Sequence, residues 1–291
     1  MSRVAIVTDT THYLPREVVE RHGFQLVSLY VNWNGRTDRE SALGDYEEFY
    51  DHLRTVEGEL PSTSQPSVGD FLSVYEPLLD GGADILTICL SGGISGTVRS
   101  AEQARDTLVE RGIAPERMHV MDSRTGCAGH GLMAIAAANA VKEGADLAGA
   151  ADAATRLRDT MHILFAVDTL EYLRRGGRIG AAQAWIGSAL KIKPILTIDS
   201  EIVPVERVRT AGRATERLVQ VLRDHRAAGA DVFFVQHVQA PEVAAQLGER
   251  GQEIYGRPPE FISEIGPVIG THTGPGLVGV TGLSSALLGP V

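Results

Sequence analysis

The chain alternates between short apolar runs and longer amphipathic segments, and this alternation constrains its fold more than any other feature. Residues 4–7, 84–90 and 119–122 are apolar runs of strand length, while residues 68–79 and 96–111 place apolar side chains at helical spacing. Strands separated by helices form parallel sheets that are covered on both faces. The first half of the chain is therefore predicted to be a parallel, Rossmann-like α/β domain.

The second half contains a pattern that a purely parallel sheet does not explain. Two β-rich runs at 194–198 and 202–208 flank a polar pair at 199–200, which predicts a hairpin and hence a mixed sheet. Helical spacing recurs at 215–228 and 241–255. We place the domain boundary at residue 155, which predicts an α/β domain over 1–155 and a second α/β domain over 156–291.

Composition narrows the class of protein. The 291 residues, 43% of them hydrophobic, suffice for two globular domains with cores of their own. Lys and Arg number 27 against 37 Asp and Glu, and the resulting net charge of −10 argues against nucleic acid as the main partner. The apolar runs are too short for a signal peptide or for the roughly 20 residues of a membrane span, so we expect a cytoplasmic protein without stable membrane insertion.

Four polar, glycine-containing stretches lie near the ends of predicted strands, at residues 8–11, 91–97, 122–131 and 270–276. In α/β proteins the carboxyl ends of parallel strands form the usual ligand site, and helices that begin there offer free N–H groups to anions. Within 91–97, Ser95 and Thr97 place hydroxyls beside such groups. A bound phosphate or carboxylate and an ordinary helix N-cap explain this spacing equally well.

Two other segments carry polar side chains of interest. A capping box of Ser67 and Asp70 explains the start of the helix at 68–79, but not the polar residues 63–65 before it. His272 lies in a Gly- and Pro-rich loop between two hydroxyl side chains, which favours a ligand-facing imidazole, although a lone histidine is more often structural. The histidines and the two cysteines show no metal-ligand spacing, so we expect no metal site.

Arginines form two groups in this acidic chain. The groups are Arg174, Arg175 and Arg178, and Arg207, Arg209 and Arg213. Taken alone, they are best interpreted as solvated helix ends, where cations suit the helix dipole. The alternative is a docking surface for an acidic or phosphorylated partner.

Seven segments, taken in order, resemble the DegV family: TDTTHYLP, TSQPSVGDF, SGGISGTVRSA, VMDSRTGCAGHGL, DTLEYLRRGGRIG, LKIKPIL and GTHTGPG. They run from residue 8 to residue 276, nearly the whole chain. The resemblance implies a two-domain α/β protein that buries one long-chain fatty acid between its domains. It implies an acyl carrier without catalytic activity or cofactor, which presents the carboxylate to a separate fatty acid kinase.

The resemblance also implies roles for individual residues. Matching motif to motif, Thr63, Ser95 and His272 hold the carboxylate of the fatty acid. Arg178 and Arg209 correspond to the positions that dock the kinase. The acyl chain that is preferred and the residues that line its tunnel are not implied.

The chain departs from the family pattern in several of these loops. The departures are Ser91-Gly92-Gly93 for a pair of serines, Val98-Arg99 for Tyr-Gln, Cys127 for a serine and Tyr13 for an acidic residue. We therefore expect fewer head-group contacts from these loops, or a different acyl preference.

Two other functions stay open at this point. One is a small-molecule enzyme, a hydrolase or an acyl or phosphoryl transferase, that uses Ser95 and His272, although the chain has no GxSxG elbow. The other is a regulatory binding module whose ligand state is read by a protein partner. A carrier holds one lipid per chain, so organic extraction of the purified protein separates it from an enzyme.

Overall fold

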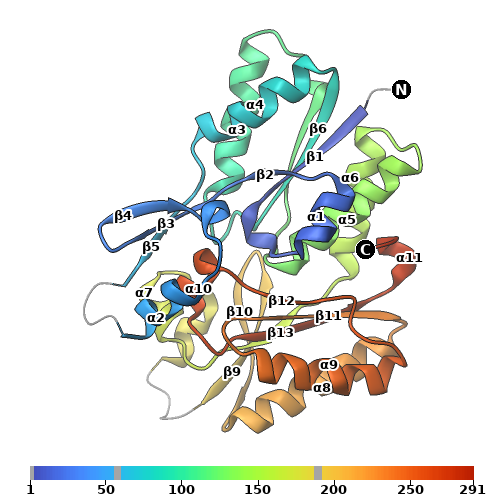
Figure 1. Cartoon of the computed structure of the whole chain (residues 1–291). Helices are drawn as coiled ribbons and strands as arrows, with labels where there is room; N and C mark the ends of the chain where they lie inside the picture. Colours follow the sequence, from blue (N-terminus) through green and yellow to red (C-terminus); the bar gives the residue numbers. More distant parts are fainter. Residues whose placement is uncertain (1–2, 56–59, 187–191) are drawn as a thin grey trace. The chain divides into compact units, whose positions relative to one another are not determined.

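The computed structural model describes residues 3–55, 60–186 and 192–291 (Figure 1). By its contacts the chain divides into two compact units. The first unit comprises Met1–Tyr30, Ser64–Thr160 and Ala286–Val291, and the second comprises Val31–Thr63 and Met161–Ser285. The crossing after Thr160 falls close to the boundary predicted at residue 155, whereas the sequence pattern does not reveal that Val31–Thr63 belongs to the second unit. The division into 1–155 and 156–291 stays a prediction.

The first unit contains a four-stranded parallel sheet in the order β2-β1-β6-β7. Its strands are β1 (Arg3–Asp9), β2 (Gln25–Val27), β6 (Ala83–Cys89) and β7 (Met118–Asp122). The apolar runs at 4–7, 84–90 and 119–122 correspond to β1, β6 and β7. The predicted parallel α/β architecture is confirmed.

Helices pack on both sides of this sheet (Figure 1). α3 (Val68–Asp80) and α4 (Thr97–Glu110) bury Phe71, Tyr75 and Ala101 against Ile85 of β6. The other helical segments of this unit are η1 (Thr10–His12), α1 (Arg16–His22), η3 (Pro115–Arg117), α5 (Ala128–Lys142) and α6 (Leu147–Thr160). α5 begins at Ala128, and its first turn contains Gly129 and Gly131, which are weak helix formers.

The second unit contains a mixed six-stranded sheet in the order β10-β9-β8-β13-β11-β12, in which only β11 and β12 pair in parallel. Its strands are β8 (Leu164–Ala166), β9 (Lys193–Asp199), β10 (Glu201–Val208), β11 (Val232–His237), β12 (Ile262–Glu264) and β13 (Val278–Leu283). The predicted hairpin is confirmed as β9 and β10. It turns at Ser200, whose φ of 62° is left-handed.

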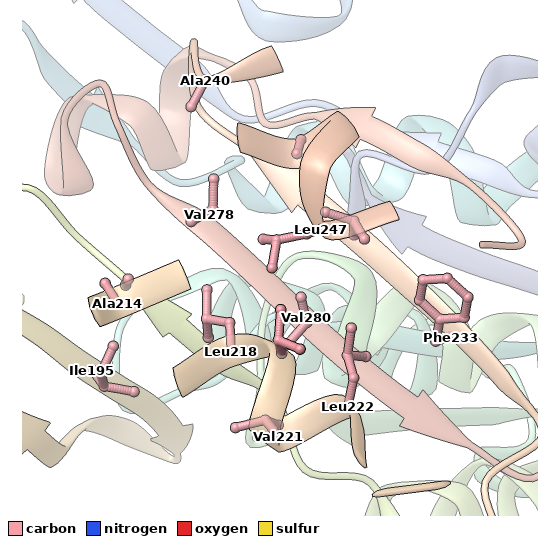
Figure 2. Close-up of a cluster of buried hydrophobic side chains, with 14 of the residues drawn as sticks. Ile195, Ala214, Leu218, Val221, Leu222, Phe233, Ala240, Leu247, Val278 and Val280 are labelled. Atoms are coloured by element: carbon pink, nitrogen blue, oxygen red, sulfur yellow. The ribbon is translucent and has the colours of Figure 1, made fainter. Parts of the chain in front are cut away.

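Two long helices, α8 (Ala211–Ala227) and α9 (Pro241–Tyr255), pack on this sheet and form a hydrophobic core with its strands. Figure 2 shows Leu218 and Leu222 of α8 beside Val280 of β13, with Leu247 contributed by α9. Each fully buried aliphatic side chain of this kind contributes about 1.5–3 kcal/mol to stability.

A small three-stranded sheet in the order β4-β3-β5 and several short helices complete the second unit. They are β3 (Tyr30–Trp33), β4 (Arg36–Arg39), β5 (Ser62–Ser64), η2 (Glu40–Ala42), α2 (Glu47–Thr55), α7 (Glu171–Arg175), η4 (Gly180–Trp185) and α10 (Pro267–Thr273). Near residue 291 the chain forms α11 (Ser285–Leu288). None of the helices in the described ranges has the length and apolar character needed to cross a bilayer.

The helix α10 corrects the prediction that residues 270–276 form a loop. Pro267 is the first residue of this helix, and Gly274 follows its last residue, Thr273. The glycine and threonines of this stretch are weak helix formers, which hides the helix in the sequence. His272 is consequently placed in the last turn of a helix that packs against α2 and α7.

Candidate functional site

Thr63 and His272 are brought together in the second unit. Thr63 is the middle residue of β5, and His272 lies in the last turn of α10. Thr63 Oγ1 and His272 Nε2 are 2.7 Å apart and hydrogen bonded across a sequence separation of 209 residues. Two of the three residues predicted to hold a carboxylate therefore meet through the fold itself.

Burial governs the charge of His272. The pKa of the ring falls from 6.5 to about 4, mainly because burial disfavours the charged form and also because the positive charge of Arg178 lies nearby. The imidazole is therefore neutral at pH 7. A neutral ring can orient a hydroxyl without placing a second charge in the site.

The surroundings of the ring select its tautomer. Nδ1 is buried and has no hydrogen-bond partner within the described part of the chain. It lies so close to Gly176 that a Cβ on that residue would be 2.2 Å away. A buried N–H without an acceptor is rarer in proteins than an unfilled acceptor, so we assign the proton to Nε2, which donates to Thr63 Oγ1. The hydroxyl proton of Thr63 is then free to donate to an anion.

Acidification should destabilise the protein through His272. The pKa of the ring is about 4 when folded and about 6.5 when unfolded, so the unfolded state binds more protons between these values. Stability should fall as the pH drops from about 6.5 towards 4, by up to about 3 kcal/mol from this group. The measurement is the free energy of unfolding against pH for the wild type and His272→Gln. The same pH dependence in both proteins would contradict a buried neutral ring.

Arg178 is connected to His272 through Gly176. Gly176 is the C-cap of α7, and its carbonyl accepts a hydrogen bond of 2.8 Å from Arg178 Nη1. Arg174 instead forms an exposed ion pair with Glu171 inside α7, as expected for a solvated helix end. Arg178 lies just beyond the end of that helix and is exposed, and its hydrogen bond to the C-cap carbonyl agrees with the helix-end interpretation.

Arg209 lies in the second unit and is exposed, next to Thr210, the N-cap of α8. The neighbouring guanidinium of Arg207 lies 4.9 Å from the ring centroid of Trp185. A cation at the N-terminus of a helix is unfavourable with respect to the helix dipole. The interpretation of this second arginine group as a helix end that stabilises the dipole is therefore wrong.

Ser95 belongs to the first unit, on the turn between β6 and α4. Its Oγ is hydrogen bonded to Thr97 Oγ1 at 2.8 Å and accepts from Thr97 N at 3.3 Å. The N-cap of α4 is Gly96, so the interpretation of Ser95 or Thr97 as an ordinary N-cap is wrong. Ser95 is half-buried at a helix N-terminus, where hydroxyl and amide donors suit an anion.

Gln65, one of the polar residues before α3, contacts this same turn. Gln65 Nε2 donates to Ser100 Oγ at 3.0 Å, and the Gln65 amide lies so close to Gly96 that a Cβ there would not fit. The capping box of Ser67 and Asp70 is confirmed by reciprocal hydrogen bonds. Thr63 and Gln65, which capping left unexplained, therefore make tertiary contacts, and the run of polar side chains at 63–65 is the sign of these contacts in the sequence.

The hypothesis of an enzyme with a Ser95, His272 and Asp122 arrangement gains no support. His272 Nε2 is bonded to Thr63, and Asp122 Oδ1 accepts from Gly92 N at 3.1 Å. In the ranges that the structure describes, no cluster of three or more His, Cys, Asp and Glu side chains is arranged to hold a metal ion. With a pKa of about 4, the buried ring of His272 is a weak base.

The residues that depart from the pattern of related chains have structural environments of their own. Val98 packs in the core of the first unit and Tyr13 is buried, whereas Arg99 is exposed. Cys127 is partly buried at the N-cap of α5. Leu190 and Lys191 of the LKIKPIL segment lie outside the described residues, and Lys193 pairs with Asp168 at 2.5 Å.

Comparison with known proteins confirms the resemblance. The model of the family described as "Uncharacterised protein, DegV family COG1307" matches residues 3–284. The chain is 41% identical over 286 residues to a DegV domain-containing protein of Streptomyces coelicolor, covering 96% of this chain and 98% of that protein. It is 37% identical over 282 residues to Protein DegV of Bacillus subtilis, covering 95% and 98%.

Solved structures agree. A DegV family protein from Thermus thermophilus, described for its fatty acid binding, superimposes with a TM-score of 0.87 at 34% identity, covering 97% of this chain and 99% of that chain. DegV of Bacillus subtilis, described as a fatty acid binding protein, gives 0.86 at 35% identity with the same coverage. On these matches, which span both α/β units, the chain belongs to the DegV family.

Proposed function

We propose that this protein binds a long-chain fatty acid in a buried tunnel and presents its carboxylate to a fatty acid kinase in the cytoplasm, as a carrier without catalytic activity. The observation that carries the proposal is the Thr63 and His272 pair, in which a neutral ring orients a hydroxyl donor near the charge of Arg178. The relatives from Thermus thermophilus and Bacillus subtilis support the class of ligand.

Thr63, Ser95 and His272 are proposed to bind one carboxylate. Thr63 is bonded to His272, and Gln65 of the same short segment is bonded to Ser100 in the helix that follows Ser95. Hydroxyl protons and helix-terminal amides are the donors that a carboxylate requires. Burial of the acyl tail contributes about 0.8 kcal/mol per CH₂, so the tail supplies most of the affinity and the head-group donors favour the acid over other lipids.

The test is to purify the protein without added lipid and compare its mass under native and denaturing conditions. We expect one fatty acid per chain in the native spectrum, released on denaturation and identifiable by organic extraction. Thr63→Val, which removes the hydroxyl donor and keeps the shape, should weaken retention about tenfold. Thr107→Val is the matched control, because the Thr107 hydroxyl donates only within α4, to Gln103 O. A lipid-free wild type that also fails to bind added fatty acids would refute the carrier.

A further inference from the structure

Two of the polar stretches singled out in the sequence have no role in the function proposed above. Residues 8–11 and 122–131 end β1 and β7, and the stretch that carries Ser95 ends β6 between them. Because these strands are parallel neighbours, the three stretches share one edge of the sheet. A buried set of polar side chains, Asp9, Thr11 and His130, lies at this edge.

Asp9 joins three segments of the first unit while being 0% exposed. Its Oδ1 accepts from Thr11 N at 3.0 Å and from Thr11 Oγ1 at 2.5 Å, which fixes η1. Its Oδ2 accepts from Leu90 N at 2.8 Å, at the end of β6. His130 Nε2, in the first turn of α5, is 3.3 Å from Oδ1. One carboxylate therefore holds a turn and a strand end by hydrogen bonds and lies against the first turn of a helix.

The carboxylate stays ionised in this buried setting. Burial raises the pKa of Asp9, but the charge of His130 and the hydrogen bonds from Thr11 and Leu90 outweigh burial and hold the pKa below its usual value. The folded protein is strongly destabilised when a buried charge loses its partners. The segments that donate hydrogen bonds to Asp9 are therefore held firmly in place.

Leu90 is the point at which Asp9 reaches Ser95. Leu90 is followed directly by the turn that carries Ser95. Ser91, the first residue of this turn, accepts a hydrogen bond at its O from Ser95 N at 3.1 Å. Its own N donates to Thr125 O at 2.7 Å. The hydrogen bond from Leu90 to Asp9 thus sets where the turn begins. The bond from Ser91 to Thr125 sets its direction.

We propose that Asp9 is a positioning residue for Ser95, and that its contact with His130 locks the Ser95 turn to helix α5. The proposal rests on the proposed function in one respect, namely that Ser95 contacts the ligand. Asp9 is buried and acts only through Leu90 and the turn that follows. The stretches at 8–11 and 122–131 would then hold the hydroxyl of Ser95, in the stretch at 91–97, in place.

The first measurement is hydrogen exchange of Asp9→Asn, which keeps the size of the side chain and removes its charge. Amides of residues 90–97 should exchange at least tenfold faster, while the amides of the α8 helix keep their wild-type rates. Asp84→Asn is the matched control, because Asp84 lies on the neighbouring strand β6 and pairs with Arg117 at 3.0 Å, far along that strand from Leu90. If Asp9→Asn does not fold, His130→Gln removes the ring contact and should loosen the same residues. Unchanged exchange at 90–97 in the variants that fold overturns the proposal.

The second measurement is a double-mutant cycle with palmitic acid and hexadecanol as probes. Asp9→Asn and Ser95→Ala should each weaken binding of the acid about tenfold and leave the alcohol unaffected, because only the acid presents a carboxylate. The double variant should bind the acid no more weakly than Ser95→Ala, since both changes remove one contact. Additive losses would overturn action through Ser95. If Ser95→Ala changes neither probe, the proposed ligand contact of Ser95 fails, and hydrogen exchange still decides whether Asp9 positions the turn.

Discussion

Replacing Gly176 by alanine should weaken fatty acid binding by about ten- to a hundredfold, through displacement of His272. An alanine Cβ would lie 2.2 Å from His272 Nδ1 and 3.1 Å from Tyr172 O, so the ring must move. The movement breaks or lengthens the hydrogen bond of 2.7 Å to Thr63. The backbone of Gly176, with φ of −75°, is open to any residue, so the effect is steric and not conformational.

A glycine with open surroundings provides the control for this change. Gly212 lies in α8, and a Cβ added there would meet no atom within 4 Å, so Gly212→Ala should be neutral or stabilise by about 0.4–1 kcal/mol. Gly176→Ala should lower stability by about 1–3 kcal/mol, as overpacking does. Adding Gly176→Ala to a His272→Ala protein should cost little more, because the ring is gone. Fatty acid titration and thermal unfolding give both readouts, and wild-type affinity in Gly176→Ala would contradict the tight packing.

Local patterns were sufficient for most of the fold. The helix predicted at 241–255 is α9 with the same limits, because its periodic apolar face lies within the segment itself. The hairpin of β9 and β10 was equally visible, since the polar turn between the strands is local. In contrast, α10 was missed because tertiary packing, and not residue propensity, makes its residues helical.

The contacts of the site depend on residues that are distant in the sequence. A motif can single out Thr63 and His272, but their hydrogen bond crosses 209 residues and is created by β5 and α10. The same holds for Gly176, which a sequence presents as a plain helix stop and which the fold places against His272. Asp9 was visible only as a polar residue after a strand. The role proposed for it rests on hydrogen bonds from Thr11 and Leu90 and on the approach of His130, which three separate segments supply.

If the proposed kinase uses this carrier, Arg178→Ala and Arg209→Ala should each lower its acyl phosphate formation about tenfold at limiting carrier and low salt, while the fold stays intact. Both arginines are exposed in a chain of net charge −10, so they offer a local attraction to an acidic partner surface. Arg209→Ala should retain full lipid loading. Arg178→Ala should load slightly less, because the positive charge that reaches His272 would also attract a carboxylate bound beside that ring.

Salt and a matched arginine distinguish docking from a general loss of charge. Screening weakens attraction between exposed charges, so the difference between the wild type and each variant should shrink as ionic strength rises. Arg16→Ala is the control, because Arg16 is exposed in the first unit, where it pairs with Glu20. It should change stability by a few tenths of a kcal/mol and leave turnover unaffected. Normal turnover of fully loaded Arg178→Ala and Arg209→Ala proteins would overturn the docking role. A turnover loss that follows lipid loading in both variants would instead assign these arginines to the ligand.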